Sequence, residues 1–248
     1  MKTIEKRKIK DIVADNYIYA SVLYYFGIEF YNYSNLTLEQ ACQNNGLNVI
    51  SVVSSLEKKE IAEAHVDVSQ LPIDLIVEYL KHTHFVFIKQ KLPYVGSLIA
   101  HLKASKSAYQ SIAKDLKFVF PLFVEDFIHH IYQEEDTLFN YIAKLDAYTK
   151  GKGHLSHLYL EMEQNNLANF ASEHEEHDDE MMGIRQITNN YSLNESSPLH
   201  IKVVYSELKD LEDELKTHAR IENEILFPKA LMLEKNVRML MREKVRYN

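Results

Sequence analysis

Apolar residues recur at helical spacing along four long stretches of the chain after residue 71. In each stretch they fall three or four positions apart, and no strand-like alternation competes with this pattern. The first stretch begins at Leu71 and meets Pro93, which predicts a kink or break. The others run roughly over 107–147 and 154–190, and from Ser196-Ser-Pro198 onward. Four amphipathic helices joined by short links predict an antiparallel four-helix bundle over residues 71–248.

A small helical domain is predicted ahead of the bundle, over residues 1–65. Gly27 is expected to end a first helix, and Thr37-Leu-Glu-Gln40 is a capping box that opens a short second one. Residues 57–70 are polar and indicate a linker. The whole chain is therefore predicted to be all-α.

Two copies of the motif H-x-x-x-E-x-x-x-L-F carry the most specific chemical signal. His130 and Glu134 belong to one copy, and His218 and Glu222 belong to the other. The spacing of four places each imidazole and carboxylate on one helix face, in line with core-facing residues. One such pair is usually a surface contact, but an unpaired carboxylate in a core costs several kcal/mol. Metal ions would satisfy both pairs at once.

Each predicted bundle helix carries a histidine within its apolar stripe, and two of the helices add a glutamate. The six candidate ligands are His84, His130, Glu134, His174, His218 and Glu222. Two metal ions, each with about two terminal histidines and with both glutamates as bridges, would use every group. Nitrogen and oxygen ligands that leave open positions favour iron or manganese. The Glu-x-x-His signature of ferritin-like proteins is absent, so a different di-metal bundle is predicted.

Several neighbouring groups remain alternatives to these ligands. They are His82, His129, His177 and Asp178. His82 lies about 200° around the helix from His84, on a polar side, whereas His177 and Asp178 follow His174 closely enough to reach the same centre. A third pair, His157 and Glu161, lacks the L-F tail and is predicted to be solvated.

Composition narrows the class of protein. The single cysteine, Cys42, excludes an intramolecular disulfide and any Cys-based zinc or iron–sulfur site within one chain. The net charge of −8 argues against a nucleic-acid-binding face. No apolar run follows the basic N-terminus, and no stretch approaches the roughly 18 apolar residues of a membrane span. We therefore expect a cytoplasmic protein with no nucleic-acid or membrane partner.

These motifs resemble those of the Repair of Iron Centers family (the YtfE/ScdA type), whose members are hemerythrin-like di-iron proteins. The resemblance covers nearly the whole chain. It is carried by H-x-x-x-E-N-x-x-L-F-P at 218–228, H-x-x-x-E-E-x-x-L-F at 130–139, Glu173-His174 with Thr188-Asn-Asn190 downstream, and His84 ahead of Leu92-Pro93. It implies a hemerythrin-like bundle in which four histidines and two glutamates bind two non-haem, carboxylate-bridged iron ions.

The function that this resemblance implies is stress response. Such proteins help to restore iron–sulfur clusters damaged by nitric oxide or peroxide, by supplying iron to the damaged client proteins. Open coordination positions would also take O₂ or NO, so a hemerythrin-like sensor is a second hypothesis. A di-iron reductase of NO or peroxide is a third. The sequence offers no site for an electron-transfer partner, which favours an iron donor over a turnover enzyme.

Two departures from the family pattern change the expectations. Phe85 occupies a position where the family usually has a histidine, so the first-helix ligand falls to His84. The N-terminal domain of the family typically carries Cys-Cys-Gly-Gly, where this chain has Phe30-Tyr-Asn-Tyr33. Tyrosine cannot replace a thiolate at neutral pH. We therefore predict a docking or homodimerising domain that uses exposed Phe and Tyr side chains.

Overall fold

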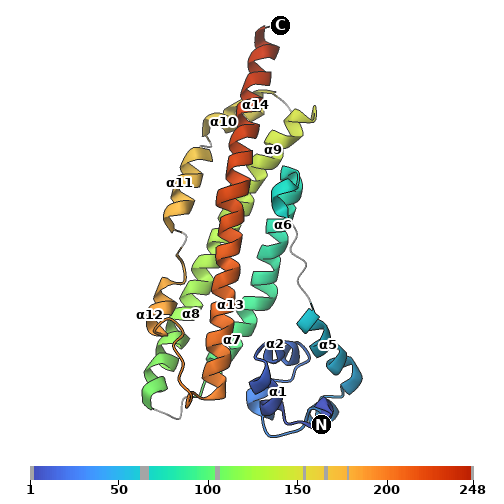
Figure 1. Ribbon diagram of the computed structural model, residues 1–248. Helices are drawn as coiled ribbons and strands as arrows, with labels where there is room; N and C mark the ends of the chain where they lie inside the picture. Colours follow the sequence, from blue (N-terminus) through green and yellow to red (C-terminus); the bar gives the residue numbers. More distant parts are fainter. Residues whose placement is uncertain are drawn as a thin grey trace. The chain divides into compact units, whose positions relative to one another are not determined.

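A computed structural model describes residues 3–61, 67–103, 107–152, 155–164, 167–177 and 179–246 (Figure 1). Every element named within these ranges is a helix, and an isolated β-bridge pairs Lys8 with Thr37. The predicted all-α fold is confirmed. Among the described residues, no helix is long and apolar enough to span a membrane.

The chain forms two compact units, each assembled from three separate stretches. The first unit comprises Met1–His65, Pro93–Phe118 and Ile184–Asp210, and the second comprises Val66–Leu92, Val119–Gly183 and Leu211–Asn248. The sequence predicts two domains that are each one continuous stretch, 1–65 and 71–248. That division stays a prediction.

Short helices make up the N-terminal part of the first unit. They are η1 (Ile4–Lys6), α1 (Ile9–Asp15), α2 (Ile18–Tyr25), α3 (Phe30–Tyr33), α4 (Leu38–Asn44) and α5 (Val49–Ile61). The predicted first helix is broken at Asn16, whose Oδ1 accepts a hydrogen bond of 3.1 Å from the amide of Ile18. The predicted stop at Gly27 holds, with φ at +76°, and the Thr37–Gln40 capping box is formed.

Helices from two later stretches of the chain complete this unit. They are α7 (Leu92–Ala100), the first part of α8 (Ser107–Gln133), α12 (Met182–Ile187) and the first part of α13 (Leu199–Ile221). Pro93 is the second residue of α7, directly after a π-helical turn, so a change of helix type replaces the predicted kink or break.

The second unit is a helical bundle whose successive long helices run antiparallel (Figure 1). Its elements are η2 (Val68–Gln70), α6 (Ile73–Val86), η3 (Phe87–Lys91), the end of α8, η4 (Glu134–Phe139), α9 (Asn140–Thr149), α10 (Leu155–Gln164), α11 (Leu167–His177), the end of α13, η5 (Glu222–Leu226) and α14 (Phe227–Arg246). Within the range predicted as a single helix, 154–190, the structure describes α10, α11 and α12, and the described residues 179–181 between α11 and α12 are not helical. Apolar residues of α6, η4, α9, α10, α11, η5 and α14 meet in one core, which includes Leu80, Leu145, Leu167 and Leu226.

Phe30 of α3 is packed inside the first unit, whereas Tyr31 and Tyr33 are half-buried. Phe30 is only 3% exposed, so the prediction that it lies on an exposed contact surface is wrong. The ring of Tyr31 stacks on those of His200 and His101, with centroids 4.8 Å and 5.2 Å away. Sequence spacing could not reveal this cluster, because its members come from three distant parts of the chain.

His200 is a neutral histidine within this cluster. Its Nε2–H donates a hydrogen bond of 3.0 Å to the carbonyl oxygen of Leu98. Burial lowers the pKa of His200 to about 4, because the charged ring would lose its hydration.

This low pKa predicts acid lability. The neutral ring stabilises the folded protein above the unfolded pKa of 6.5, and this contribution is lost as the pH falls toward 4. Between pH 7 and pH 5 the protein should therefore lose about 2 kcal/mol more of its free energy of unfolding than His200→Gln does. Urea denaturation at both pH values measures this, with His101→Gln as the exposed control. An equal pH dependence in His200→Gln and the unaltered protein would contradict the assignment.

Candidate metal centre

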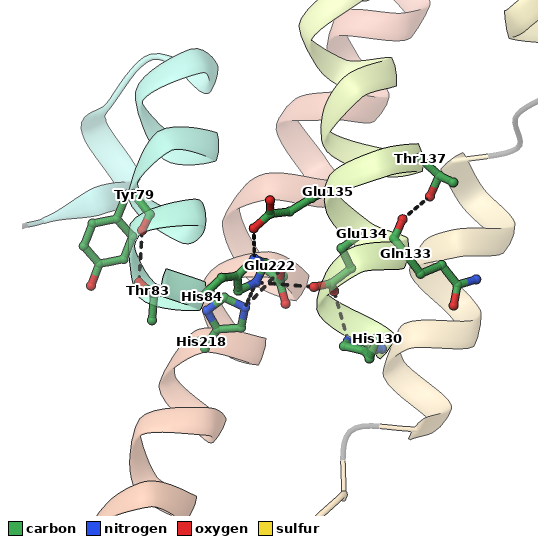
Figure 2. Close-up of polar contacts among 10 residues, drawn as sticks. All are labelled: Tyr79, Thr83, His84, His130, Gln133, Glu134, Glu135, Thr137, His218 and Glu222. Atoms are coloured by element: carbon green, nitrogen blue, oxygen red, sulfur yellow. Dashed lines mark hydrogen bonds and ion pairs between the residues drawn. The ribbon is translucent and has the colours of Figure 1, made fainter. Parts of the chain in front are cut away.

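Four polar side chains from three bundle helices converge inside the second unit. His84 comes from α6, Glu134 is the first residue of η4, and His218 and Glu222 come from α13 and η5. One ligand atom from each lies within 4.8 Å of all the others (Figure 2). Their side chains are between 1% and 7% exposed, so the cluster is almost fully removed from water.

The distances within this cluster match those around a shared metal ion. The Nε2 atoms of His84 and His218 are 3.0 Å apart, and the Nε2 of His84 is 3.4 Å from the Oε2 of Glu134. The Nε2 of His218 is 3.3 Å from the Oε1 of Glu222. Ligand atoms bound about 2.1 Å from one metal lie about 3.0–3.4 Å from each other, at right-angled or tetrahedral geometry. These three distances are therefore those expected between ligand atoms of one metal ion.

The carboxylate of Glu134 lies between histidines of two different helices. Its Oε1 is 3.1 Å from the Nε2 of His130, whereas its Oε2 faces His84. The side chain of His130 is 35% exposed, so this end of the cluster is the more open to solvent. The two oxygens of this carboxylate therefore face imidazoles of two different helices.

Glu135 fixes the orientation of the His84 ring. Its Oε1 is 2.8 Å from the Nδ1 of His84 (Figure 2). A carboxylate accepts hydrogen bonds, so Nδ1 carries the proton and Nε2 is left to face Glu134 and His218. Carboxylate–histidine pairs of this kind orient metal ligands and raise their basicity. Glu135 was missed in the sequence, although the tandem Glu-Glu of the motif was a signal for it.

The surroundings of His84 also change its affinity for protons. Burial by itself lowers the pKa of the ring, but the carboxylates of Glu134, Glu135 and Glu222 outweigh burial and raise it above its usual value. The same negative charges that hold a proton here would hold a metal cation, so protons and metal compete for this site.

The remaining sequence candidates are placed unequally. The backbone of His174 lies in α11, but its side chain and that of His177 are outside the described residues, as is all of Asp178. His82 and His129 are exposed, and neither joins the cluster. His157 is exposed as predicted, and Glu161 forms an ion pair of 2.8 Å with Lys144.

Three π-helical turns, which the sequence pattern does not predict, lie at the cluster. The turns η4 and η5 begin at Glu134 and Glu222, and η3 begins three residues after His84. A π turn holds one more residue than an α turn and is frequent at functional sites. Both residues of each L-F pair are buried beside these turns, Leu138 with Phe139 and Leu226 with Phe227.

The cluster also agrees with what the chain is similar to. The family model for the hemerythrin HHE cation binding domain matches residues 94–230, more than half of the chain. The protein therefore belongs to the hemerythrin HHE family, and membership implies that it binds metal cations. The matched range contains His130, Glu134, His218 and Glu222 and begins after His84.

Curated relatives match over a longer range at low identity. The chain is 17% identical over 222 residues to the iron-sulfur cluster repair protein ScdA of Staphylococcus haemolyticus, a match that covers 89% of this chain and 96% of ScdA. It is 24% identical over 195 residues to the iron-sulfur cluster repair protein YtfE of Escherichia coli O8, covering 79% of this chain and 83% of YtfE. The resemblance noted in the sequence is thereby confirmed.

The contact between Glu135 and His84 predicts a loss of metal affinity on substitution. Glu135→Gln keeps the size of the side chain but removes its charge, so Nδ1–H is held less strongly and Nε2 becomes a poorer ligand. We expect about 10- to 100-fold weaker binding of Fe²⁺ under anaerobic conditions, measured by competition with a chelator. Asp136→Asn is the matched control, because Asp136 is adjacent but exposed. Equal affinities in the two variants would show that Glu135 has no orienting role.

Proposed function

We propose that this protein is a non-haem di-iron protein that repairs damaged iron–sulfur clusters by supplying iron. The observation that carries the proposal is the buried His84–Glu134–His218–Glu222 cluster, whose atoms have the spacing of metal ligands. The printed names of the relatives, iron-sulfur cluster repair proteins, supply the substrate class.

Two metal ions, rather than one, account best for the donor set. Glu134 presents one oxygen to His130 and the other to His84, on opposite sides of its carboxyl group. We infer that it bridges two ions and that Glu222 is the second bridge. The terminal ligands would be His84, His130, His174 and His218, with His174 supplied from α11. Imidazole and carboxylate ligands with open positions favour iron over zinc in such a pair.

The charge of the buried groups supports the binding of two divalent cations at this site. Two buried carboxylates carry two negative charges, and burying such charges without compensation costs several kcal/mol each. Two divalent ions would neutralise them and leave a net positive charge for exogenous ligands. When bound, iron would supply a Lewis-acidic and redox-active centre. The protein orients the ligands and keeps water away from the buried side chains of His84, Glu134, His218 and Glu222.

Release of iron is as necessary to a donor as binding. No thiolate is among the proposed ligands, and nitrogen and oxygen ligands hold ferrous iron less tightly than a thiolate cage does. His130 is the most exposed of the described ligands, at 35%, and it is paired with a bridging carboxylate. We infer that iron leaves from this side, as protons replace it on the histidines.

The ligand assignment predicts which neighbours matter. His84→Ala and His130→Ala should each lose at least one of two bound irons per chain, whereas His82→Ala and His129→Ala should keep both, because those side chains are exposed. Elemental analysis after anaerobic iron loading measures this. The first two variants should also lose the increase in melting temperature that iron gives the unaltered protein, since a ligand bound only to the folded state stabilises it. Iron loss in His82→Ala with retention in His84→Ala would overturn the assignment.

The proposed repair activity predicts iron transfer to a damaged client. An enzyme whose [4Fe–4S] cluster has been damaged by peroxide should regain activity when mixed with the iron-loaded protein. Glu134→Gln should abolish this recovery, because a neutral amide cannot bridge two cations. Glu163→Gln, an exposed position of α10, is the control. Recovery that is equal with Glu134→Gln, at matched total iron, would show that the centre is not the donor.

A further inference from the structure

A second polar pocket lies wholly within the first unit and shares no residue with the His–Glu cluster. Its volume is about 330 Å³, and it is lined by Lys10, Phe30, Tyr31, His101, Lys103 and His200, among others. These residues come from all three stretches of the unit. Small-molecule sites are typically concave, largely apolar and equipped with a few convergent polar groups.

We propose that this pocket, named here the Tyr31 pocket, binds a small organic anion that consists of a planar ring carrying one carboxylate or phosphate group. Two lysines and a stacked set of aromatic rings meet there, which matches a ligand with one charged end and one flat apolar end. The proposed function does not depend on this site.

Charge favours an anion. None of the described residues that line the pocket is acidic, although the whole chain has a net charge of −8. Neither Lys10 nor Lys103 forms an ion pair with a residue that the structure describes. The nearby carboxylate of Glu29 accepts a hydrogen bond of 2.6 Å from Asn32. Glu29 also interacts with Tyr31, so two ammonium groups stand against one nearby carboxylate, and the remaining local positive charge attracts anions.

The aromatic wall favours a planar ring. The rings of Tyr31 and His200 are nearly parallel, with an interplanar angle of 3°, and His101 stacks on Tyr31 at 18°. The edge of His200 also meets Phe30, with centroids 5.4 Å apart. The faces in these stacks are already in contact, so a ligand ring would pack against the outer faces and the edges of the stacked rings, in offset or edge-to-face geometry.

The wall is held in place before any ligand arrives. The Nδ1 of His101 donates to the carbonyl of Ser97 at 2.9 Å, and His200 is anchored to the carbonyl of Leu98. The hydroxyl of Tyr31 is 3.3 Å from the Oγ of Ser97. A half-buried histidine whose charged form is disfavoured, in a preformed pocket, is a frequent mark of a functional site. Fixed rings lose little further conformational entropy on binding.

Benzoate is the probe that tests the proposal, in the full-length protein. It has both the ring and the charge, benzamide has the ring alone, and inorganic phosphate has the charge alone. Titrations followed by the ring signals of ¹³C-labelled histidine should show saturable shifts at His101 and His200 with a Kd of about 1 mM for benzoate. Benzamide and inorganic phosphate should each bind about tenfold more weakly or worse.

Double lysine variants then test whether Lys10 and Lys103 bind the carboxylate of benzoate. Lys10→Gln with Lys103→Gln should weaken benzoate binding about tenfold, since two charge-assisted contacts are lost. Lys6→Gln with Lys114→Gln changes the net charge equally at exposed positions outside the pocket, and should leave the affinity unchanged. The proposal is overturned if benzamide or phosphate binds as tightly as benzoate, if both double variants bind alike, or if 20 mM benzoate produces no saturable shift at either histidine.

Discussion

The burial of two glutamates is the constraint on which the second unit depends. Glu134 and Glu222 are 6% and 1% exposed, and each opens a π-helical turn beside a histidine. Charged carboxylates are stable in such a place only when nearby groups compensate them. The histidines, and the metal cations that membership of the HHE family implies, supply that compensation. The bundle core can then close around the cluster, with Leu138, Phe139, Leu226 and Phe227 buried directly after the ligands.

Much of the fold and of the site was predictable because it depends on periodicity within single helices. The four-residue spacing from His130 to Glu134 and from His218 to Glu222 survives in the structure, and register with Leu80 correctly separated buried His84 from exposed His82. The π turns were not predicted, because the spacing of apolar residues does not show where a helical turn contains an extra residue. Glu135 was missed because its role depends on a partner 51 residues away.

The N-terminal segment illustrates a different limit. The absence of the usual cysteine pair was visible in the sequence, but what replaces it was not. Phe30 was expected at the surface, yet it is buried, and Tyr31 is stacked on His101 and His200. Contacts between segments about 70 to 170 residues apart leave no local pattern in the chain.

In the proposed centre, Glu134 joins two iron ions. X-ray absorption spectroscopy at the iron edge, on anaerobically iron-loaded protein, tests it most directly. A bridged pair predicts a first shell of nitrogen and oxygen atoms and a second scatterer, iron, at roughly 3.5 Å. A first shell without any iron neighbour, in protein that holds its full complement of metal, would contradict the bridged pair.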